Sequence, residues 1–186
     1  MSEADLISRA RRGDEAAWEA LVREHQEPIF RLAYLLLSDA HDAEDVAQET
    51  FIRAFRALHT FDTARSLRPW LLTITSNLSH NKRRSLGRYL GALRRVYAEP
   101  EPVAHIGERS AQQWEAETLW QAVKKLNPNE QEVVYLRYFL EMSEAEMAST
   151  LQVAPGTVKS RLHRAMNRLR AVVDQEFPAL REERQA

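Results

Sequence analysis

The sequence predicts an all-α protein made of two small helical domains joined by a flexible linker, the C-terminal domain being a helix-turn-helix. Only 5 of the 186 residues are glycine, and the helix-forming residues Ala, Leu, Glu and Arg are abundant. No stretch alternates β-branched and polar residues with a period of two, so we expect no strands. Three of the five glycines fall between residues 85 and 110, together with Pro100 and Pro102, which predicts the linker.

Apolar periodicity and capping signals place the individual helices. Asp14 can cap the second helix, Pro69 suits a first helical turn, and Ser143 can form a capping box with Glu146. A break is expected in the second helix at Pro28. The expected helices lie at residues 4–12, 15–38, 42–59, 68–84, 111–126, 129–140, 144–151 and 155–173. They divide the chain into a domain at 1–84, a linker at 85–110, a second domain at 111–176 and a tail at 177–186.

Composition excludes several classes of protein. The chain has no cysteine, which excludes disulfide scaffolds, thiolate metal sites and cysteine catalysis. Its 6 histidines show no metal-ligand spacing and no glycine-rich phosphate loop is present, so we expect no metal, no cofactor and no enzyme activity. The longest apolar run, Leu32 to Leu37, is too short to cross a bilayer, and no secretory signal is visible. We expect a soluble, cytoplasmic protein.

The net charge of −1 conceals two strongly basic segments. Residues 68–97 hold seven basic and no acidic residues, and residues 156–173 hold five basic and no acidic residues. The rest of the chain is acidic. Because binding to a polyanion needs local positive charge rather than a basic total, these segments predict two separate contacts with nucleic acid. The alternative is that they are two solvated helix faces.

The second basic segment belongs to a predicted helix-turn-helix. A short helix capped by Ser143 would bury Met147 and Leu151, residues 152–154 would form the turn, and Pro155 would open the second helix. The second helix would bury one apolar face, formed by Val158, Leu162, Ala165, Met166 and Leu169. Side chains on its other face can reach bases or phosphates, chiefly those of Lys159, His163 and Arg164. The alternative is a plain amphipathic hairpin with a solvated basic face.

The helix expected at 42–59 has one apolar and one polar side. Val46, Thr50 and Ala54 project to one side, whereas Ile52 stands alone among polar residues on the other. A single exposed isoleucine is ordinary. Ringed by charge, however, it is typical of a protein-binding face with a small apolar anchor. The polar side consists of Asp45, Gln48, Glu49, Ile52 and Arg56.

The helix expected at 68–84 combines an aromatic-containing apolar stripe with amides and bases. Asn77 and Asn81 lie one turn apart at the margin of the stripe, and three basic residues at 82–84 end the helix. This arrangement suits single-stranded bases held by hydrogen bonds and phosphates held by charge. The alternative is that the bases only complement the dipole of the helix. The stripe itself consists of Trp70, Leu71, Ile74 and Leu78.

Three segments together resemble the extracytoplasmic-function class of bacterial sigma factors, in order and in spacing. They are DAEDVAQETFIRAFRAL at 42–58, RPWLLTITSNLSHNKRR at 68–84 and GTVKSRLHRA at 156–165. The resemblance implies that the first domain binds the clamp of core RNA polymerase and melts the −10 element. It implies that the second domain reads the −35 element and contacts the polymerase flap, and that an anti-sigma factor binds the protein. This chain departs from the usual family pattern at Ser76 and Asn81, where Arg and Asp are common.

The resemblance also assigns residues, with the loop at 61–67 holding a flipped −10 base beside Asn77. The residues that would face the polymerase clamp are Asp45, Gln48, Glu49, Ile52 and Arg56. The residues that would contact the −10 region are Phe61, Asp62, Arg65, Ser66, Asn77, Asn81, Lys82, Arg83 and Arg84. The residues that would contact the −35 element are Thr157, Lys159, Ser160, Arg161, His163, Arg164 and Arg168.

A different class of protein also fits part of the sequence. A stand-alone helix-turn-helix regulator with an N-terminal helical sensor domain would account for residues 142–170. It would leave the basic segment at 68–97 and the face around Ile52 unexplained. The two hypotheses differ in a simple test, because a stand-alone regulator should shift promoter duplex by itself, whereas a sigma factor usually needs core polymerase.

Overall fold

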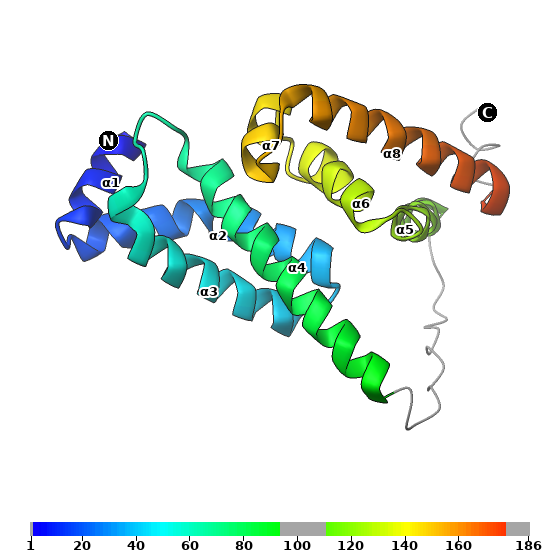
Figure 1. The fold of residues 1–186 in the computed structure, drawn as a ribbon, viewed down its shortest axis with the longest axis horizontal. Coiled ribbons are helices and arrows are strands. Elements are labelled where there is room, and N and C mark those ends of the chain that lie inside the picture. The colour runs from blue at the N-terminus through cyan, green and yellow to red at the C-terminus, as the bar shows by residue number, and fades with distance from the viewer. Residues whose placement is uncertain (1, 94–110, 178–186) are drawn as a thin grey trace.

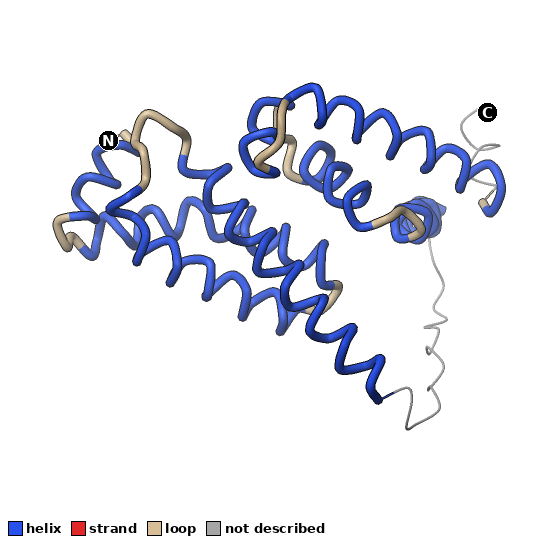
Figure 2. Tube along the Cα trace, viewed as in Figure 1, coloured by secondary structure: helices blue, strands red, loops and turns tan. Residues whose placement is uncertain are grey.

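The computed structural model describes residues 2–93 and 111–177, with side chains at 2–85 and 116–177. Every element in these ranges is helical, which confirms the all-α prediction (Figures 1 and 2). The N-terminal half contains α1 (Glu3–Arg11), α2 (Glu15–Leu37), α3 (Ala40–Ala57), the 3-10 turn η1 (Leu58–Thr60) and α4 (Leu67–Leu93). The C-terminal half contains α5 (Ala111–Lys124), α6 (Pro128–Val134), the π-helix η2 (Tyr135–Phe139), α7 (Glu144–Leu151) and α8 (Pro155–Glu176).

The second helix is continuous, and the break expected at Pro28 is wrong. Proline lacks an amide hydrogen and costs roughly 3 kcal/mol inside a helix. On both sides of it, however, α2 buries the same stripe, and Leu21, Ile29 and Leu32 are each at most 1% exposed. Burying one such side chain contributes about 1.5–3 kcal/mol. Packing on both sides of Pro28 therefore outweighs the cost of one missing hydrogen bond.

The fourth helix is longer than expected, since it runs to Leu93 rather than to Arg84. The glycines at 87 and 91, which suggested a linker, lie within it. A glycine inside a helix costs about 1 kcal/mol relative to alanine but keeps its amide hydrogen, so it does not stop the helix as proline does. The remaining part of the expected linker, 94–110, and most of the expected tail, from 178, lie outside the described residues. The exact domain boundaries therefore stay a prediction.

The helix expected at 129–140 consists of two elements. α6 begins with a capping box between Asn127 and Glu130, and after Val134 the chain widens into the π-helix η2. In this turn the amide of Leu140 donates to the carbonyl of Tyr135 at 3.1 Å, five residues back. Single π turns are rare and occur frequently at functional sites.

The helix-turn-helix is confirmed. Ser143 caps α7 through the amide of Glu146, and Gln152 ends that helix in the left-handed conformation, with φ of 54°. Pro155 opens α8, and Val158 and Leu169 are buried on its inner side.

The two halves of the molecule pack against each other. α7 lies against α4, and η2 touches α2. Figure 1 shows α7 beside the upper part of α4, and α8 running along the outer edge of the C-terminal half. The buried side chains of both halves form one continuous apolar cluster, with a small second cluster between α2 and α3.

Candidate functional site

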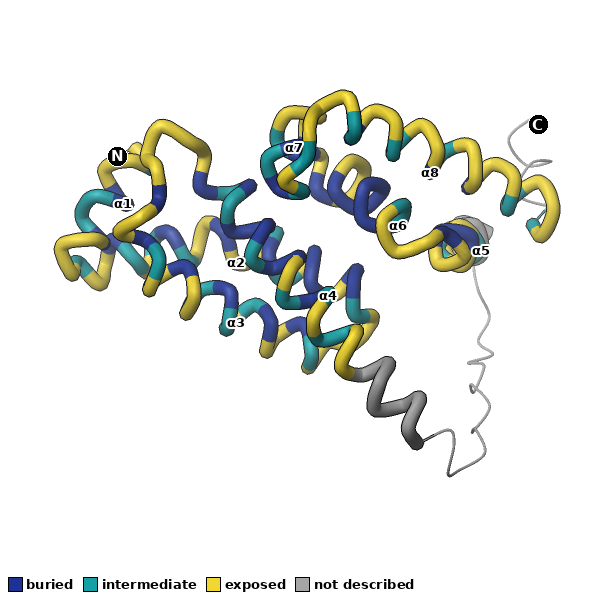
Figure 3. The backbone as a smooth tube through the Cα atoms, in the orientation of Figure 1, coloured by how far each residue is buried: buried dark blue, intermediate teal, exposed yellow. Residues whose placement is uncertain are grey.

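The outer side of α3 presents the predicted protein-binding face to solvent. Ile52 is 45% exposed, whereas Val46 and Ala54 on the inner side are at most 4% exposed. Buried and exposed positions alternate along this helix in Figure 3. Among the polar residues assigned to the face, all are exposed except Glu49, which is half-buried and accepts a hydrogen bond from Arg53 at 2.7 Å. The expected exposure is thus found, and the partner of the face stays a prediction.

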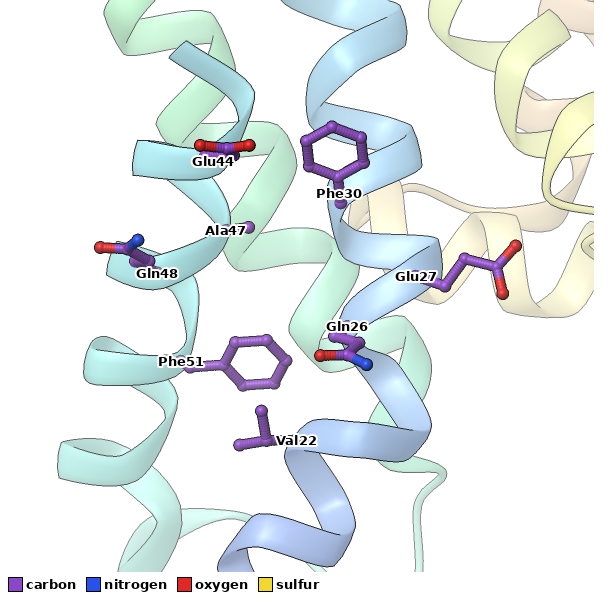
Figure 4. Close-up of a pocket in the computed structure, with 8 residues that line it drawn as sticks. All are labelled: Val22, Gln26, Glu27, Phe30, Glu44, Ala47, Gln48 and Phe51. Carbon is purple, nitrogen blue, oxygen red and sulfur yellow. The ribbon is translucent and has the colours of Figure 1, made fainter. Parts of the chain in front are cut away.

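A groove accompanies this face where α3 meets α2. Figure 4 shows Phe51 of α3 and Val22 of α2 projecting toward each other between the two helices. Phe55, which the sequence analysis missed, is 51% exposed, and its ring lies 5.1 Å from that of Trp18. Its position three residues after Ile52 was the available signal, because residues three apart share a helix face. The groove is lined by Val22, Gln26, Glu27, Phe30, Glu44, Ala47, Gln48 and Phe51.

An exposed loop at 62–66 connects η1 to α4. Asp62 shapes its first turn by accepting the amide of Ala64 at 3.0 Å, and Arg65 and Ser66 are exposed. Phe61 differs from its assignment as a DNA contact, because it is 7% exposed and its ring packs 4.9 Å from that of Trp70. We therefore correct that assignment: Phe61 anchors the loop in the core.

Asn77 and Asn81 are both exposed on α4, as expected. Asn77 follows Leu67, the first residue of α4, by ten positions. At a rise of 1.5 Å per residue this places it about 15 Å along the helix axis from the end of the loop. The expectation that Asn77 lies beside the loop is therefore wrong. A base held by the loop and a base contacted by Asn77 would be different bases.

Lys82 is engaged by acidic residues of α3. Its Nζ lies 2.8 Å from Asp42 Oδ1 and 3.0 Å from Asp45 Oδ2. Burial alone would lower the pKa of Lys82, but hydrogen bonds to the two carboxylates raise it above its usual value. The same contact lowers the pKa of Asp45. We therefore correct the assignment of Lys82 as a phosphate contact: it ties α4 to α3.

The other two bases at the end of this basic cluster differ in their surroundings. Arg84 is exposed and donates to Asn81 Oδ1 at 2.7 Å. Arg83 is half-buried and near Tyr135 of the C-terminal half. Burial raises the pKa of Tyr135 to about 12, an effect that the charge of Arg83 opposes. Of the three, Arg84 is the one most open to a phosphate.

The outer face of α8 carries the predicted DNA-reading residues. Lys159, His163 and Arg164 are exposed, and Figure 3 shows this side of α8 largely open to solvent. Asn167 hydrogen-bonds His163 at 3.0 Å, which orients the imidazole ring. No side chain caps the start of α8, although the amide of Thr157 already donates to the carbonyl of Ala154 at 2.9 Å. Of the other assigned residues, Ser160 and Arg168 are exposed. Thr157 and Arg161 are half-buried.

Glu132 of α6 joins the two halves. It is 4% exposed, accepts a hydrogen bond from the Ser76 hydroxyl and lies with Oε2 3.0 Å from His80 Nε2. Beside it, the hydroxyl of Thr73 donates to the carbonyl of Thr150 at 2.9 Å. Sequence reasoning missed this group. The available signal was Ser76 itself, a small hydroxyl residue where the family pattern has Arg.

Arginines of the N-terminal half also reach the end of the π-helix. Arg31 donates to the carbonyl of Phe139 at 3.2 Å, and Arg68 donates to that of Leu140 at 2.6 Å. The last carbonyls of a helix lack partners within it and carry partial negative charge, so cations stabilise them. A third arginine, Arg65 in the exposed loop, donates to the Ser149 hydroxyl at 3.1 Å.

One group in the described part of the chain has a spacing that a metal ion could use. Ligand atoms of Glu3, Glu24 and His25 lie within 4.8 Å of one another. Glu3 has protein contacts through both oxygens, since one lies 3.3 Å from His25 Nε2 and the other accepts the amide of Leu67 at 3.1 Å. None of the described helices is long and apolar enough to span a membrane.

The helix-turn-helix and the helical N-terminal half define a DNA-binding protein of the sigma-70 type. The family model for sigma-70 region 2 matches residues 21–89, and that for sigma-70 region 4 matches residues 116–169. The ECF RNA polymerase sigma factor SigW of Bacillus subtilis is 31% identical over 173 residues, which cover 88% of this chain and 92% of that protein. SigL of Mycobacterium tuberculosis is 32% identical over 170 residues, 91% of this chain and 96% of that protein. The chain belongs to the ECF RNA polymerase sigma factors.

Longer relatives and solved structures agree with this family. SigE of Mycolicibacterium smegmatis is 39% identical over 169 residues, and this chain spans 63% of its length. The structure resembles that of CnrH in complex with the cytosolic domain of CnrY, with a TM-score of 0.70, 28% identity and coverage of 94% of this chain and 98% of that chain. It also resembles the sigma factor RpoE in complex with the anti-sigma factor NepR from Bartonella quintana, with a TM-score of 0.64, 26% identity and coverage of 85% and 97%.

Proposed function

We propose that this ECF sigma factor binds core RNA polymerase through α2 and α3, opens and holds the −10 element with the loop at 62–66 and α4, and reads the −35 element with α8. The observation that carries the proposal is the exposed apolar pair Ile52 and Phe55 beside the groove between α2 and α3. The protein then works in the cytoplasm, with promoter DNA and without a catalytic site of its own.

The face on α3 has the composition of a protein interface. Ile52 and Phe55 supply apolar area at its centre, and Gln48 and Arg56 supply polar groups around them. The groove lined by Phe51 and α2 would accept side chains of a helical partner. The clamp of core polymerase is the partner that we assign to it.

The face on α8 suits the major groove. Arg164 can pair with a guanine, and the Gly156 amide at the start of α8, which no side chain caps, can bind a phosphate. His163, oriented by Asn167, adds a donor or an acceptor next to them. Residues 156 to 173 include no acidic residue, so the charge of this segment attracts phosphates, although Glu130 of α6 lies 3.8 Å from Arg168.

The docked arrangement of the two halves has to open on the promoter. By the positions in their names, the −10 and −35 elements are centred roughly 25 base pairs apart, about 85 Å at 3.4 Å per base pair. In the docked structure the −10 loop touches the helix-turn-helix directly, through Arg65 and Ser149. Both elements therefore cannot be read at once until the contacts of Glu132 and the arginines to η2 are released.

A partner protein that favours the docked form would keep the sigma factor inactive. CnrH, which this structure resembles over most of its length, is in complex with the cytosolic domain of CnrY, and the Bartonella RpoE is in complex with the anti-sigma factor NepR. We therefore propose an anti-sigma factor as a second protein partner of this chain. The anti-sigma factor would have to bind the surface that polymerase uses, or bind both halves and hold them together.

The polymerase contact is tested by Ile52→Asp in the full-length chain. We expect at least tenfold weaker binding to core polymerase, because a buried charge would replace an apolar anchor, with helical content and melting temperature nearly unchanged. Ala40→Asp, at an exposed position at the start of the same helix, is the control. Unchanged affinity for polymerase would refute the assignment of this face.

The test against a stand-alone regulator uses the wild-type protein, with and without core polymerase. On a promoter found by run-off transcription with core polymerase, the free protein should leave the duplex unshifted, and the complex with polymerase should shift it. A specific shift by the free protein would favour the regulator instead.

A further inference from the structure

The first helix, α1, holds both ends of the loop that connects η1 to α4. At the start of the loop, Arg11 donates through Nε to the carbonyl of Leu58 at 2.9 Å and through Nη2 to the carbonyl of Phe61. At the end of the loop, Glu3 accepts the amide of Leu67 at 3.1 Å. These two side chains come from opposite ends of α1, so the helix spans the base of the loop.

The helix itself is firmly placed. Ser2 and Asp5 form a capping box at its start, and Leu6, Ile7 and Ala10 are at most 7% exposed in the core. A buried face of this kind fixes the position of the helix against α2, so the ends of the loop are held to a rigid element rather than to another loop.

His25 of α2 completes the arrangement at the end of the loop. It is 5% exposed, and its Nε2 lies 3.3 Å from the Glu3 oxygen that does not bind Leu67. The carboxylate of Glu3 therefore lies between α2 and the first amide of α4. This Nε2 atom forms no hydrogen bond within the described residues, so it lies beside the Glu3 carboxylate without orienting it.

The tip of the loop is exposed while its ends are held, and it touches the C-terminal half through the hydrogen bond from Arg65 to Ser149. Residues 62–66 are all exposed, whereas Phe61 and Leu67 on either side are at most 7% exposed. Capturing a base requires a pocket that is formed before the base leaves the stack, because unstacking already costs a few kcal/mol. A loop with fixed ends loses less conformational entropy on binding than a free one.

We propose that α1 positions the loop at 62–66 for capture of a −10 base, with Arg11 and Glu3 as positioning residues. The proposal rests on the proposed function, in which this loop holds that base. It assigns a role to a helix that precedes the segment matched by sigma-70 region 2, which begins at residue 21. Neither residue touches DNA in this scheme; both act through the backbone of the loop.

The test uses the full-length protein in complex with core polymerase, on a promoter selected by run-off transcription. Two readouts are needed: the affinity for a labelled single-stranded oligonucleotide of the −10 region, and permanganate reactivity of thymines in the duplex promoter. Arg11→Met should weaken the affinity for the single-stranded oligonucleotide about tenfold, which is the typical contribution of a hydrogen bond from a charged donor. It should also lower the permanganate reactivity of the duplex promoter, while the affinity for polymerase stays unchanged. Arg12→Met, which removes an exposed charge at the same helix end, is the control.

Conservative variants separate positioning from folding. Arg11→Lys should recover part of the loss, because an ammonium group can donate to one carbonyl but lacks the fork that reaches two. Glu3→Gln keeps an oxygen that can accept the Leu67 amide and should act like the wild type, whereas Glu3→Ala should not. If Arg11→Met proves too unstable to assay, the Glu3→Gln and Glu3→Ala pair decides the matter, and equal oligonucleotide affinity in both would overturn the proposal.

Variants of the loop tip show which hypothesis fails. If Asp62→Ala with Ser66→Ala weakens capture but Arg11→Met does not, the role of α1 is overturned and the role of the loop stands. If the tip variants leave capture unchanged, the loop does not hold the base, and the proposal for α1 is overturned with it. A parallel fall in polymerase affinity and melting temperature for Arg11→Met and Glu3→Ala would mean that α1 only stabilises the fold.

Discussion

Replacing Glu132 with Ala should release the C-terminal half from α4. The carboxylate is 4% exposed and takes part in two contacts across the domain interface, with the Ser76 hydroxyl and with His80 Nε2 at 3.0 Å. Hydrogen bonds to charged groups contribute about 1.5–3 kcal/mol, and a part of this is regained when Ser76 and His80 meet water in the open form. We therefore expect docking to weaken by about 1.5–3 kcal/mol, which shifts the closed-to-open ratio roughly 10- to 150-fold.

The assay exploits the absence of cysteine from the chain. Ala40→Cys on α3 and Ala171→Cys on α8, both exposed positions, can be labelled with a donor and an acceptor dye. Energy transfer should fall in Glu132→Ala but not in Glu144→Ala, an exposed glutamate at the start of α7. Unchanged transfer in Glu132→Ala, with both halves still folded by circular dichroism, would mean that Arg31, Arg68 and the apolar cluster hold the halves together and that Glu132 does not.

Other predictions concern DNA, strand opening and pH. Arg164→Ala should cost roughly 1–3 kcal/mol and relax preference at one position of the −35 element, and an equal loss on every sequence variant would remove it from the reading residues. Arg84→Ala should weaken binding about equally on all promoters and reduce its salt dependence in titrations at several salt concentrations. Asn77→Ala should leave polymerase affinity intact but lower permanganate reactivity on duplex promoters; normal reactivity would show that it takes no part in melting. Hydrogen bonds from the Ser143 hydroxyl and backbone amide lower the pKa of Glu146 below 4.5. The cap therefore stabilises the fold above that value and is lost as the pH falls through the lower folded value. Thermal melts from about pH 6 to pH 3 should show this acid loss in the wild type and less of it in Glu146→Gln, while identical curves would contradict the assignment.

The residues by themselves determined the all-α class, the approximate place of most helices, the helix-turn-helix and the exposed faces of α3 and α8. These features depend on periodicity and on capping, which act over a few residues, as with Ser143 at the start of α7. The same periodicity predicted correctly that Ile52 is exposed and that Val158 is buried. Local sequence patterns predict whether a side chain is buried or exposed to solvent.

Only the tertiary structure decided which groups meet. The contact of Glu132 with Ser76 spans 56 residues and that of Arg11 with Phe61 spans 50, and no local pattern encodes such pairs. The continuity of α2 through Pro28 is a similar case, because the cost of a proline is local but the packing that outweighs it comes from other helices. Whether a basic residue is free for DNA also depends on its neighbours in space, as Lys82 shows between two carboxylates of α3.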